Sequence, residues 1–319
     1  MTVPALLLHL LVFPGLLFLV SWSLALEWVD RKVAARMQSR VGPPPLQPLA
    51  DFVKLLGKEV IQPGGAGGRV LGLAPLLSFA SVATAFLLLP VSGSSPLGFQ
   101  GDLVVALYLL TVPTVALLLV GWSSSNVFAA VGGVRAVTQM FIYEVPFYLA
   151  LLGPALLAGS WSVSGIVEWQ AGRPWMGILQ PVGLLVGLVG LQAKLERTPF
   201  DIPEAETEIV AGPLTELTGR RLAVMHLAKD ALLAAGCALL AALFLGGPLR
   251  PFSAALPGAV EGFLWFAAKT LLLLLVLSTM RAATARIRID QLDAWGWKVL
   301  CSLALAQMAL VPFLASWME

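Results

Sequence analysis

Six carboxylates fall within twenty-one residues near the middle of the chain, between two long apolar segments of a protein that is only 12% charged. A carboxylate placed in lipid costs several kcal/mol, so these groups must face water, a partner or one another. The cluster therefore predicts an ion path, or the mouth of one, that moves cations; a solvated acidic loop is the alternative. It comprises Glu196, Asp201, Glu204, Glu206, Glu208 and Glu216, and all but Glu196 are assigned to the path.

Glu144 is a further candidate for the ion path, because it lies inside an apolar segment and Pro146 follows it two residues later. An intramembrane carboxylate is a functional candidate by default. A proline in a span frees a backbone carbonyl, which usually faces protein or a water-filled cavity. Desolvation and mutual repulsion should raise the pKa values of carboxyls in such a path. The structural alternative is that Glu144 pairs with a basic neighbour such as Lys269.

Basic residues form a second set of candidates, expected to dock a partner or to pair with the acids. Lys32, Arg36 and Arg40 follow one another at intervals of four, which predicts one helical face. Arg197 is expected to be a local counter-charge of the acidic cluster. A role in membrane topology alone is the alternative for the basic loops. The full set consists of eight basic residues and one acid: Arg31, Lys32, Arg36, Arg40, Arg135, Arg197, Arg286, Arg288 and Asp290.

Composition places the chain among polytopic membrane proteins, since 58% of its residues are hydrophobic and its mean hydropathy is +0.88. It has two cysteines and two histidines, far apart in the sequence, which offer no iron–sulfur, zinc or other metal spacing. We therefore expect no metal and no cofactor bound by this chain. Nor does the sequence contain a nucleophile and base of the kind that a membrane-embedded enzyme would need.

Apolar segments of spanning length predict an all-α membrane domain over residues 1–319 with about eight transmembrane helices. Between the first two spans, the segment LADFVKLLGKEVI predicts an amphipathic helix at the membrane interface. Gly42 and three prolines separate it from the first helix. The predicted spans are 4–27, 70–90, 102–122, 136–158, 177–195, 222–246, 259–280 and 296–317.

The basic residues are distributed very unevenly between the two sides of this arrangement. Sixteen of the twenty lysines and arginines fall in four loops, 28–69, 123–135, 194–221 and 281–298. The positive-inside rule places these loops in the cytoplasm. We therefore predict a multi-pass protein of the cytoplasmic (inner) membrane with both termini outside.

Four sequence blocks, spread from residue 30 to residue 298, resemble one family. They are DRKVAARMQSRVGP, AAVGGVRAVTQMFIYEVP, RTPFDIPEAETEIVAGPLTE and RIRIDQLDAWGWK. In this order they are similar to the membrane-anchor subunit of respiratory complex I and of energy-converting membrane-bound [NiFe]-hydrogenases. The resemblance implies eight spans at the junction of a soluble electron-transfer arm with the membrane arm. It also implies an ion path that begins at the acidic loop and at Glu144.

Departures from the complex I pattern favour the hydrogenase-like branch. The segment from Gly42 to Gln47 reads GPPPLQ and is several residues shorter than is usual, and GPLTE replaces a GYxTE sequence. In complex I this region shapes the mouth of the quinone tunnel, so quinone binding is doubtful. Lys194 stands where the pattern commonly has Glu, and that carboxylate is not carried over.

The preferred function is a non-catalytic, ion-translocating anchor of a multisubunit oxidoreductase. The resemblance implies iron–sulfur clusters, with nickel–iron in the case of a hydrogenase, in soluble, hydrogenase-like partners on the cytoplasmic side. Other membrane-arm, antiporter-like subunits and lipid are the further partners, and nucleic acid is not. The alternatives are the quinone-binding subunit of complex I and a secondary ion transporter, although we find no paired repeats of the kind that transporters show.

Overall fold

In the computed structural model, residues 8–62, 64–65, 67–93, 95–250 and 258–318 are described, and this part contains helices and loops but no strand. The all-α prediction is confirmed. The principal helices are α2 (Leu16–Met37), α3 (Gln47–Gly57), α4 (Gly68–Leu87), α5 (Asp102–Leu109), α6 (Val112–Ser123), α7 (Val127–Ala158), α8 (Val163–Trp169), α9 (Met176–Leu179), α10 (Pro181–Lys194), α11 (Glu206–Ile209), α12 (Gly219–Leu245), α13 (Ala259–Ala283), α14 (Ile289–Trp295) and α15 (Cys301–Met318). A 3-10 turn, η1 (Gly212–Leu214), precedes α12, and a π-helical turn, η2 (Gly296–Leu300), joins α14 to α15.

Seven helical segments of the described chain are long and apolar enough to cross a membrane. The region of the predicted fifth span, 177–195, forms α9 and α10 instead, with a break at Gln180 before Pro181. The 14 residues of α10 extend about 21 Å, which is shorter than the ~30 Å hydrocarbon core of a bilayer. The seven segments are Leu8–Met37, Gly68–Leu87, Asp102–Ser123, Val127–Ala158, Gly219–Leu245, Val260–Ala283 and Ile289–Ser316.

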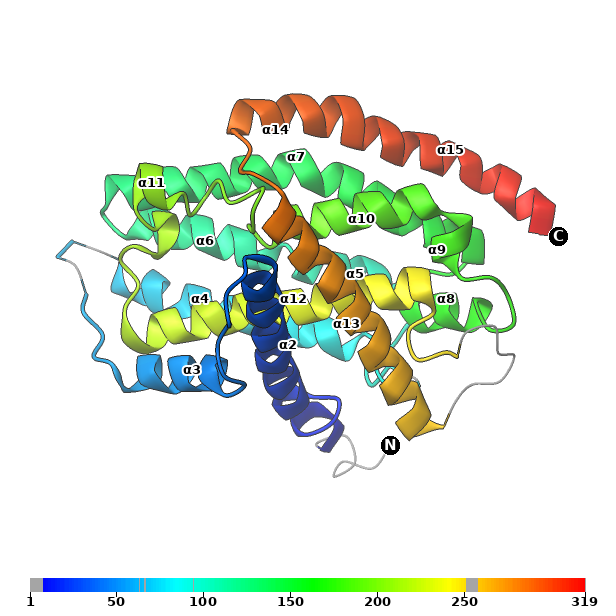
Figure 1. Ribbon diagram of the computed structural model, residues 1–319, viewed down its shortest axis with the longest axis horizontal. Helices are drawn as coiled ribbons and strands as arrows, with labels where there is room; N and C mark the ends of the chain where they lie inside the picture. The colour runs from blue at the N-terminus through cyan, green and yellow to red at the C-terminus, as the bar shows by residue number, and fades with distance from the viewer. Residues whose placement is uncertain (1–7, 63, 66, 94, 251–257, 319) are drawn as a thin grey trace.

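Helix α12 forms the centre of the bundle. Its most apolar 18-residue window is 89% buried, the largest share among the seven spans. Figure 1 shows α4, α6, α7, α10 and α12 running side by side, with α2 and α13 crossing in front of them and α15 along one edge. Many positions of α12 are Ala or Gly, which lets neighbouring helices approach closely.

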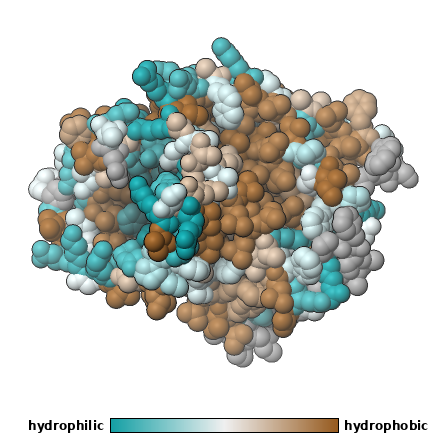
Figure 2. Space-filling model, viewed as in Figure 1, coloured by the Kyte–Doolittle hydropathy of each residue, from teal (hydrophilic) through white to brown (hydrophobic). Residues whose placement is uncertain are grey.

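The outer surface of the bundle is apolar. Large side chains such as Leu17, Tyr108, Phe141, Leu185 and Phe313 are exposed. In Figure 2 hydrophobic residues cover most of the visible face, while hydrophilic residues gather over the C-terminal end of α2 and the neighbouring edge. A surface of this kind suits lipid on its apolar part and water at the hydrophilic end.

The four basic loops lie together at one end of the bundle. The backbone N–H of Gly67 donates to Ser123, and that of Ile287 donates to Pro199, at 2.9 and 3.0 Å. The Thr218 hydroxyl accepts from the N–H of Ile61 at 2.9 Å. These bonds connect all four loops, so the loops share one side, as the charge asymmetry requires.

Two helix boundaries differ from the sequence-based expectation. Helix α2 already ends at Met37, before Gly42 and its prolines, and Ser39 has a left-handed backbone with a φ of 60°. Arg40 therefore lies beyond the helix, and the prediction that it shares a helical face with Lys32 and Arg36 is wrong. Helix α7 begins at Val127, nine residues before the predicted span, because Asn126 caps it by accepting from the N–H of Phe128 at 2.9 Å.

Candidate functional site

The loop after α10 turns back into the protein instead of running over its surface. Pro199 and Pro203 interrupt helix formation, and the side chains of Phe200, Ile202 and Ala205 are buried. The side chain of Gln192 in α10 donates to the carbonyl of Thr198 at 2.7 Å and holds the bend. Glu196, Asp201 and Glu204 are thereby placed beside residues of α2 and α12 that line the same cavity.

The loop lines a cavity of about 450 Å³, which we call the charged cavity. Asp201 and Glu204 of the predicted path belong to its wall, and α12 contributes Lys229 and Asp230. Such a concentration of ionisable groups requires water or mutual pairing, since isolated buried charges are costly. The charged residues of the wall, with His226, are Glu27, Arg31, Glu196, Arg197, Asp201, Glu204, His226, Lys229, Asp230 and Arg281.

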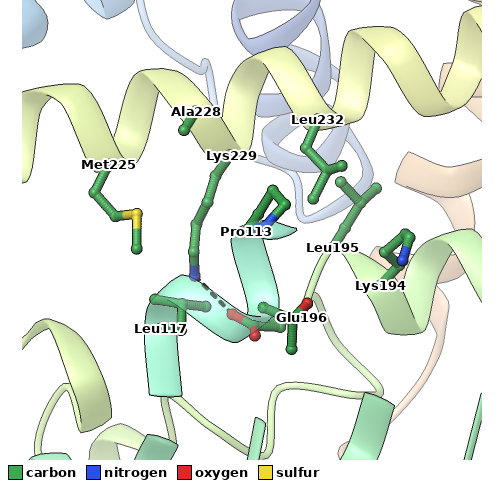
Figure 3. A pocket seen from close by; sticks show the side chains of 10 residues that line it. Pro113, Leu117, Lys194, Leu195, Glu196, Met225, Ala228, Lys229 and Leu232 are labelled. Carbon is green, nitrogen blue, oxygen red and sulfur yellow. Dashed lines mark hydrogen bonds and ion pairs between the residues drawn. The ribbon is translucent and has the colours of Figure 1, made fainter. Parts of the chain in front are cut away.

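Lys229 joins two carboxylates at the inner side of the charged cavity. Its Nζ donates to Glu196 Oε2 at 2.8 Å, and it forms a second, short bond to Glu204. Figure 3 shows Lys229 extending from α12 to the Glu196 carboxylate. Burial raises the pKa of Glu196, against the opposing effect of the Lys229 charge. Glu196 is thus a carboxyl that can hold a proton, although the sequence analysis left it outside the path.

Glu144 forms the next ion pair inward. It accepts from Lys194 Nζ at 3.1 Å and from the Tyr148 hydroxyl at 2.7 Å. The Lys194 side chain is fully enclosed, and its Nζ lies 5.5 and 5.8 Å from the ring centres of Tyr143 and Phe147. Aromatic faces stabilise a desolvated cation at such distances.

The suggested pairing of Glu144 with Lys269 is wrong. Lys269 Nζ instead donates to the carbonyls of Gly247 and Leu249, at 2.9 and 2.6 Å, beyond the end of α12. It also lies 4.5 Å from the ring centre of Trp175. Helix α12 begins at the basic loops, and Gly247 and Leu249 follow its other end. These partners of Lys269 therefore lie at the end of the bundle opposite the basic loops.

The salt bridges of Arg197 join the loop to α2. Its guanidinium binds Glu27 and Asp30 of α2 at 2.7 and 2.8 Å. Asp30 also accepts from Arg281 and from the Ser278 hydroxyl of α13, each at 2.6 Å. Burial opposes the charge of Arg197, but Asp30 and Glu27 outweigh it and raise the pKa of the guanidinium. This network fastens the loop to α2 and α13.

The sequence analysis missed Glu27 as a site residue and considered Asp30 only as part of a motif. A usable signal existed, since acidic residues three apart inside an apolar first span are expensive unless they are paired. Arg197, the partner that they share, lies 167 and 170 residues away in the chain, so no local pattern identifies it.

Arg31 connects α2 with the interfacial helix α3. It binds Glu27 at 2.7 Å and Asp51 at 3.0 Å. Burial opposes the charge of Asp51, yet the hydrogen bonds from Arg31 and Gln47 lower its pKa. Beneath α3 lies a second cavity of about 270 Å³, which shares Arg31, His226 and Asp230 with the charged cavity.

Two carboxylates of the predicted path lie elsewhere. Glu208 binds Arg135 at 2.6 Å and Arg286 at 3.4 Å and lines a separate cavity of about 440 Å³. The Arg135 hydrogen bond and the Arg286 charge lower the pKa of Glu208, so the expectation of a raised value is wrong here. Glu216 accepts from the Asn126 side chain at 2.6 Å. Glu206 begins α11, and its side chain lies outside the described part of the structure.

Several of the predicted docking residues lie open at the end of the bundle that carries the basic loops. Arg36, Arg40, Arg288 and Asp290 are exposed, and Lys32 is half-buried. Within the described ranges none of these five forms a salt bridge. No group of three or more His, Cys, Asp or Glu side chains among the described residues is arranged to hold a metal ion.

Comparison with known proteins places this geometry in a family. The family described as "NADH dehydrogenase" matches residues 9–312. The chain belongs to the NADH dehydrogenase family. It is 37% identical to a subunit of the NADH-quinone oxidoreductase of Dehalococcoides mccartyi (strain CBDB1), over 96% of this chain and 87% of the relative. It is 40% identical to the corresponding protein of Anoxybacillus flavithermus, over 88% and 85% of the two chains.

A solved structure extends the likeness to a second kind of respiratory membrane complex. A chain in the structure of the membrane-bound sulfane sulfur reductase, an archaeal respiratory membrane complex, matches with a TM-score of 0.87 and 25% identity. The match covers 96% of this chain and 99% of the other. The expected family resemblance is confirmed: the protein is a multi-pass membrane subunit of a multisubunit, complex I-like respiratory oxidoreductase.

Proposed function

We propose that this chain anchors a soluble electron-transfer arm to the membrane and couples its reaction to ion movement. The observation that carries the proposal is a row of buried and half-buried acids and bases inward from the charged cavity. Glu204, Lys229 and Glu196 form its first part, and Lys194, Glu144 and Tyr148 form its second. We call these six residues the charge row.

A charge row of this kind transmits a change in charge because its members compensate one another. Each lysine is enclosed with one or two carboxylates, and interactions between such groups are much stronger than in water. A charge that arrives at the charged cavity therefore changes which carboxyl of the row is protonated. Successive changes of this kind move an ion inward without any large motion of the backbone.

For the partner set we propose a hydrogenase-like complex, with iron–sulfur clusters in its soluble subunits and, in the case of a hydrogenase, nickel–iron as well. The short GPPPLQ connection between α2 and α3 supports this partner set. The match to the sulfane sulfur reductase chain, which covers 99% of that chain, supports it as well. Antiporter-like subunits and lipid would adjoin the membrane face. In this arrangement the basic loops face the cytoplasm, the protein lies in the cytoplasmic membrane, and both termini are outside.

The test is Glu144→Gln in the complete complex, which keeps the size and hydrogen bonding of the side chain but removes its charge. In vesicles this variant should abolish the ion gradient, while the soluble arm still reduces artificial acceptors. Glu168→Gln, at an exposed side chain of α8, is the matched control. A wild-type gradient with Glu144→Gln would contradict the proposal, and a gradient formed without the soluble arm would indicate a secondary transporter.

One observation favours a second candidate, the quinone-binding subunit of a complex I. The cavity beneath α3 combines apolar residues such as Phe52 and Leu55 with the polar groups Arg31, His226 and Asp230. A quinone has the same combination of an apolar body and a polar ring. Crosslinking by a photoreactive ubiquinone analogue to α3, abolished by excess ubiquinone, would favour this function over the hydrogenase-like one.

A further inference from the structure

The Tyr148 hydroxyl lies between two acceptors that belong to different helices. It is 2.7 Å from Glu144 Oε1, one turn earlier in α7, and 3.3 Å from the carbonyl oxygen of Leu107 in α5. A tyrosine hydroxyl has a single hydrogen, so it can donate to only one of these oxygens at a time. The shorter distance and the negative charge of an ionised carboxylate favour Glu144.

The Leu107 carbonyl needs a donor because α5 and α6 are separate helices within one span. A continuous α-helix would direct the N–H of Thr111 to Leu107. This N–H instead donates to the carbonyl of Tyr108 at 3.1 Å. A backbone carbonyl without a donor is costly inside a membrane, and the Tyr148 hydroxyl can satisfy this one.

Glu144 lies where α7 meets α10 and the interrupted span. Lys194 is the charged group that α10 presents to it, at 3.1 Å from the same oxygen that Tyr148 binds. Tyr143 and Tyr148 are the titratable groups beside it on α7, and Tyr143 bonds to the Thr114 side chain of α6. Both tyrosines next to Glu144 therefore contact the span that contains the break.

We propose that Tyr148 is a positioning residue for Glu144 and links the protonation of this carboxyl to the break between α5 and α6. The inference rests on the function proposed above and deepens it. While Glu144 is charged, the Tyr148 hydroxyl donates to it. When Glu144 takes up a proton, its O–H donates to the Tyr148 oxygen, and the hydroxyl hydrogen turns to the Leu107 carbonyl. Tyr148 keeps its own proton throughout, so no charge passes through it.

This exchange of hydrogen bonds gives the interrupted span two states. With Glu144 charged, the Leu107 carbonyl lacks the Tyr148 hydrogen, and the join between α5 and α6 is held less firmly to α7. With Glu144 protonated, the additional bond fastens the join. The arrival of a proton at Glu144 thus tightens the contact between α7 and the broken span.

The first test measures the pH dependence of ion-gradient formation per electron by the whole complex in inverted vesicles. Tyr148→Phe removes a donor to the Glu144 carboxylate, so the charged form is reached only at higher pH. The profile should move to higher pH by about one to two units, because a hydrogen bond to a charged group changes an ionisation equilibrium roughly ten- to a hundredfold. Tyr108→Phe is the matched control, since Tyr108 is 69% exposed. It should keep the wild-type profile.

The second test measures hydrogen exchange over residues 102–123 in the purified subunit. Glu144→Gln represents the protonated carboxyl, because its amide can donate to the Tyr148 oxygen. Exchange near the join should then be about two- to tenfold slower than in the wild type at a pH at which Glu144 is charged, the effect of one hydrogen bond. Tyr148→Phe combined with Glu144→Gln should remove this protection.

The two tests separate the inference from the proposed function. If Glu144→Gln abolishes the gradient but Tyr148→Phe keeps the wild-type pH profile, the positioning role is overturned and the function stands. If Glu144→Gln keeps the gradient, the function fails, and hydrogen exchange alone decides the link to the break. If Tyr148→Phe does not assemble, exchange in Glu144→Gln decides, and equal or faster exchange than in the wild type overturns the proposal.

Discussion

At the scale of single residues, the unusual feature is a lysine enclosed completely in the membrane part of the protein. Lys194 has a carboxylate at 3.1 Å and two aromatic rings within 6 Å, so its charge is compensated although it lacks contact with water. A buried pair of this kind is weak evidence for stability, because desolvation of both charges offsets their attraction. Removal of one partner is a different matter, since it leaves the other charge buried alone.

We predict that Lys194→Met destabilises the subunit by about 3–5 kcal/mol, because Glu144 is left buried without its counter-charge. The double variant Lys194→Met with Glu144→Gln should recover much of this loss. Lys54→Met, at a side chain that is 73% exposed, should cost less than about 1 kcal/mol. Denaturant unfolding of the purified protein in detergent measures all three, and additive effects of the two single variants would refute the pairing.

The carboxyls Glu196 and Glu208 should respond to pH in opposite ways. Burial raises the pKa of Glu196 above its ordinary 4.5, so its neutral form is favoured by folding, and that contribution is lost as pH rises through the folded pKa. Arg135 and Arg286 lower the pKa of Glu208 below 4.5, so its contribution exists above pH 4.5 and is lost as pH falls through the folded pKa.

Infrared titration of the purified subunit checks this contrast. A protonated carboxyl band should persist above pH 4.5 in the wild type and lose intensity in Glu196→Gln. Glu208→Gln should leave that band unchanged. A band that is equally strong without Glu196 would assign the raised pKa to another residue.

At the scale of elements, the decisive arrangement is the inward loop between α10 and α12 together with the helices that receive it. Hydropathy predicted most of the spans, because lipid requires an apolar helix of nearly fixed length whatever its neighbours are. The prolines at 199 and 203 interrupt helix formation in this loop, because proline lacks the backbone N–H that a helix needs. The pairing of the charges could not be predicted, because the partners of Lys194, Glu144 and Arg197 depend on how whole helices are rotated and packed.

Helix α7 holds that loop at a point of very close backbone approach. A Cβ atom on Gly132 would lie 2.8 Å from Gly212 Cα and 2.9 Å from the carbonyl oxygen of Pro203. We predict that Gly132→Ala displaces the loop and exposes it to limited proteolysis in the purified subunit. Gly57→Ala is the control, because a Cβ there meets no atom within 4 Å. Equal cleavage rates of the two variants would show that the loop does not depend on this contact.

At the scale of the whole molecule, polar contacts join the loops at the end of the bundle that carries the basic residues, and a broad apolar face covers much of the rest. Arg36, Arg40 and Arg288 are exposed at this end of the bundle and have no ion-pair partners among the described residues. Unpaired basic groups on a surface attract an acidic partner strongly at low salt and weakly at high salt.

We predict that the double variant Arg36→Glu with Arg40→Glu releases the soluble arm while the membrane arm stays assembled. Like charges across the contact would then repel. Arg173→Glu, at the opposite end beside Trp169, should leave the complex intact. Copurification in moderate salt measures the result, and an intact complex with the double variant would disprove the docking surface.

The network around Asp30 has a consequence for the synthesis of the protein. Asp30 lies in the first span, but its partners Arg197, Ser278 and Arg281 follow it by 167, 248 and 251 residues. At about 5–20 residues per second, a ribosome needs roughly 12–50 seconds to make that length of chain. During this time the first helix carries a carboxylate that has none of these partners. The Asp30 end of the first helix must therefore remain at the aqueous surface during synthesis. The other helices can pack around Asp30 only after α13 has been made.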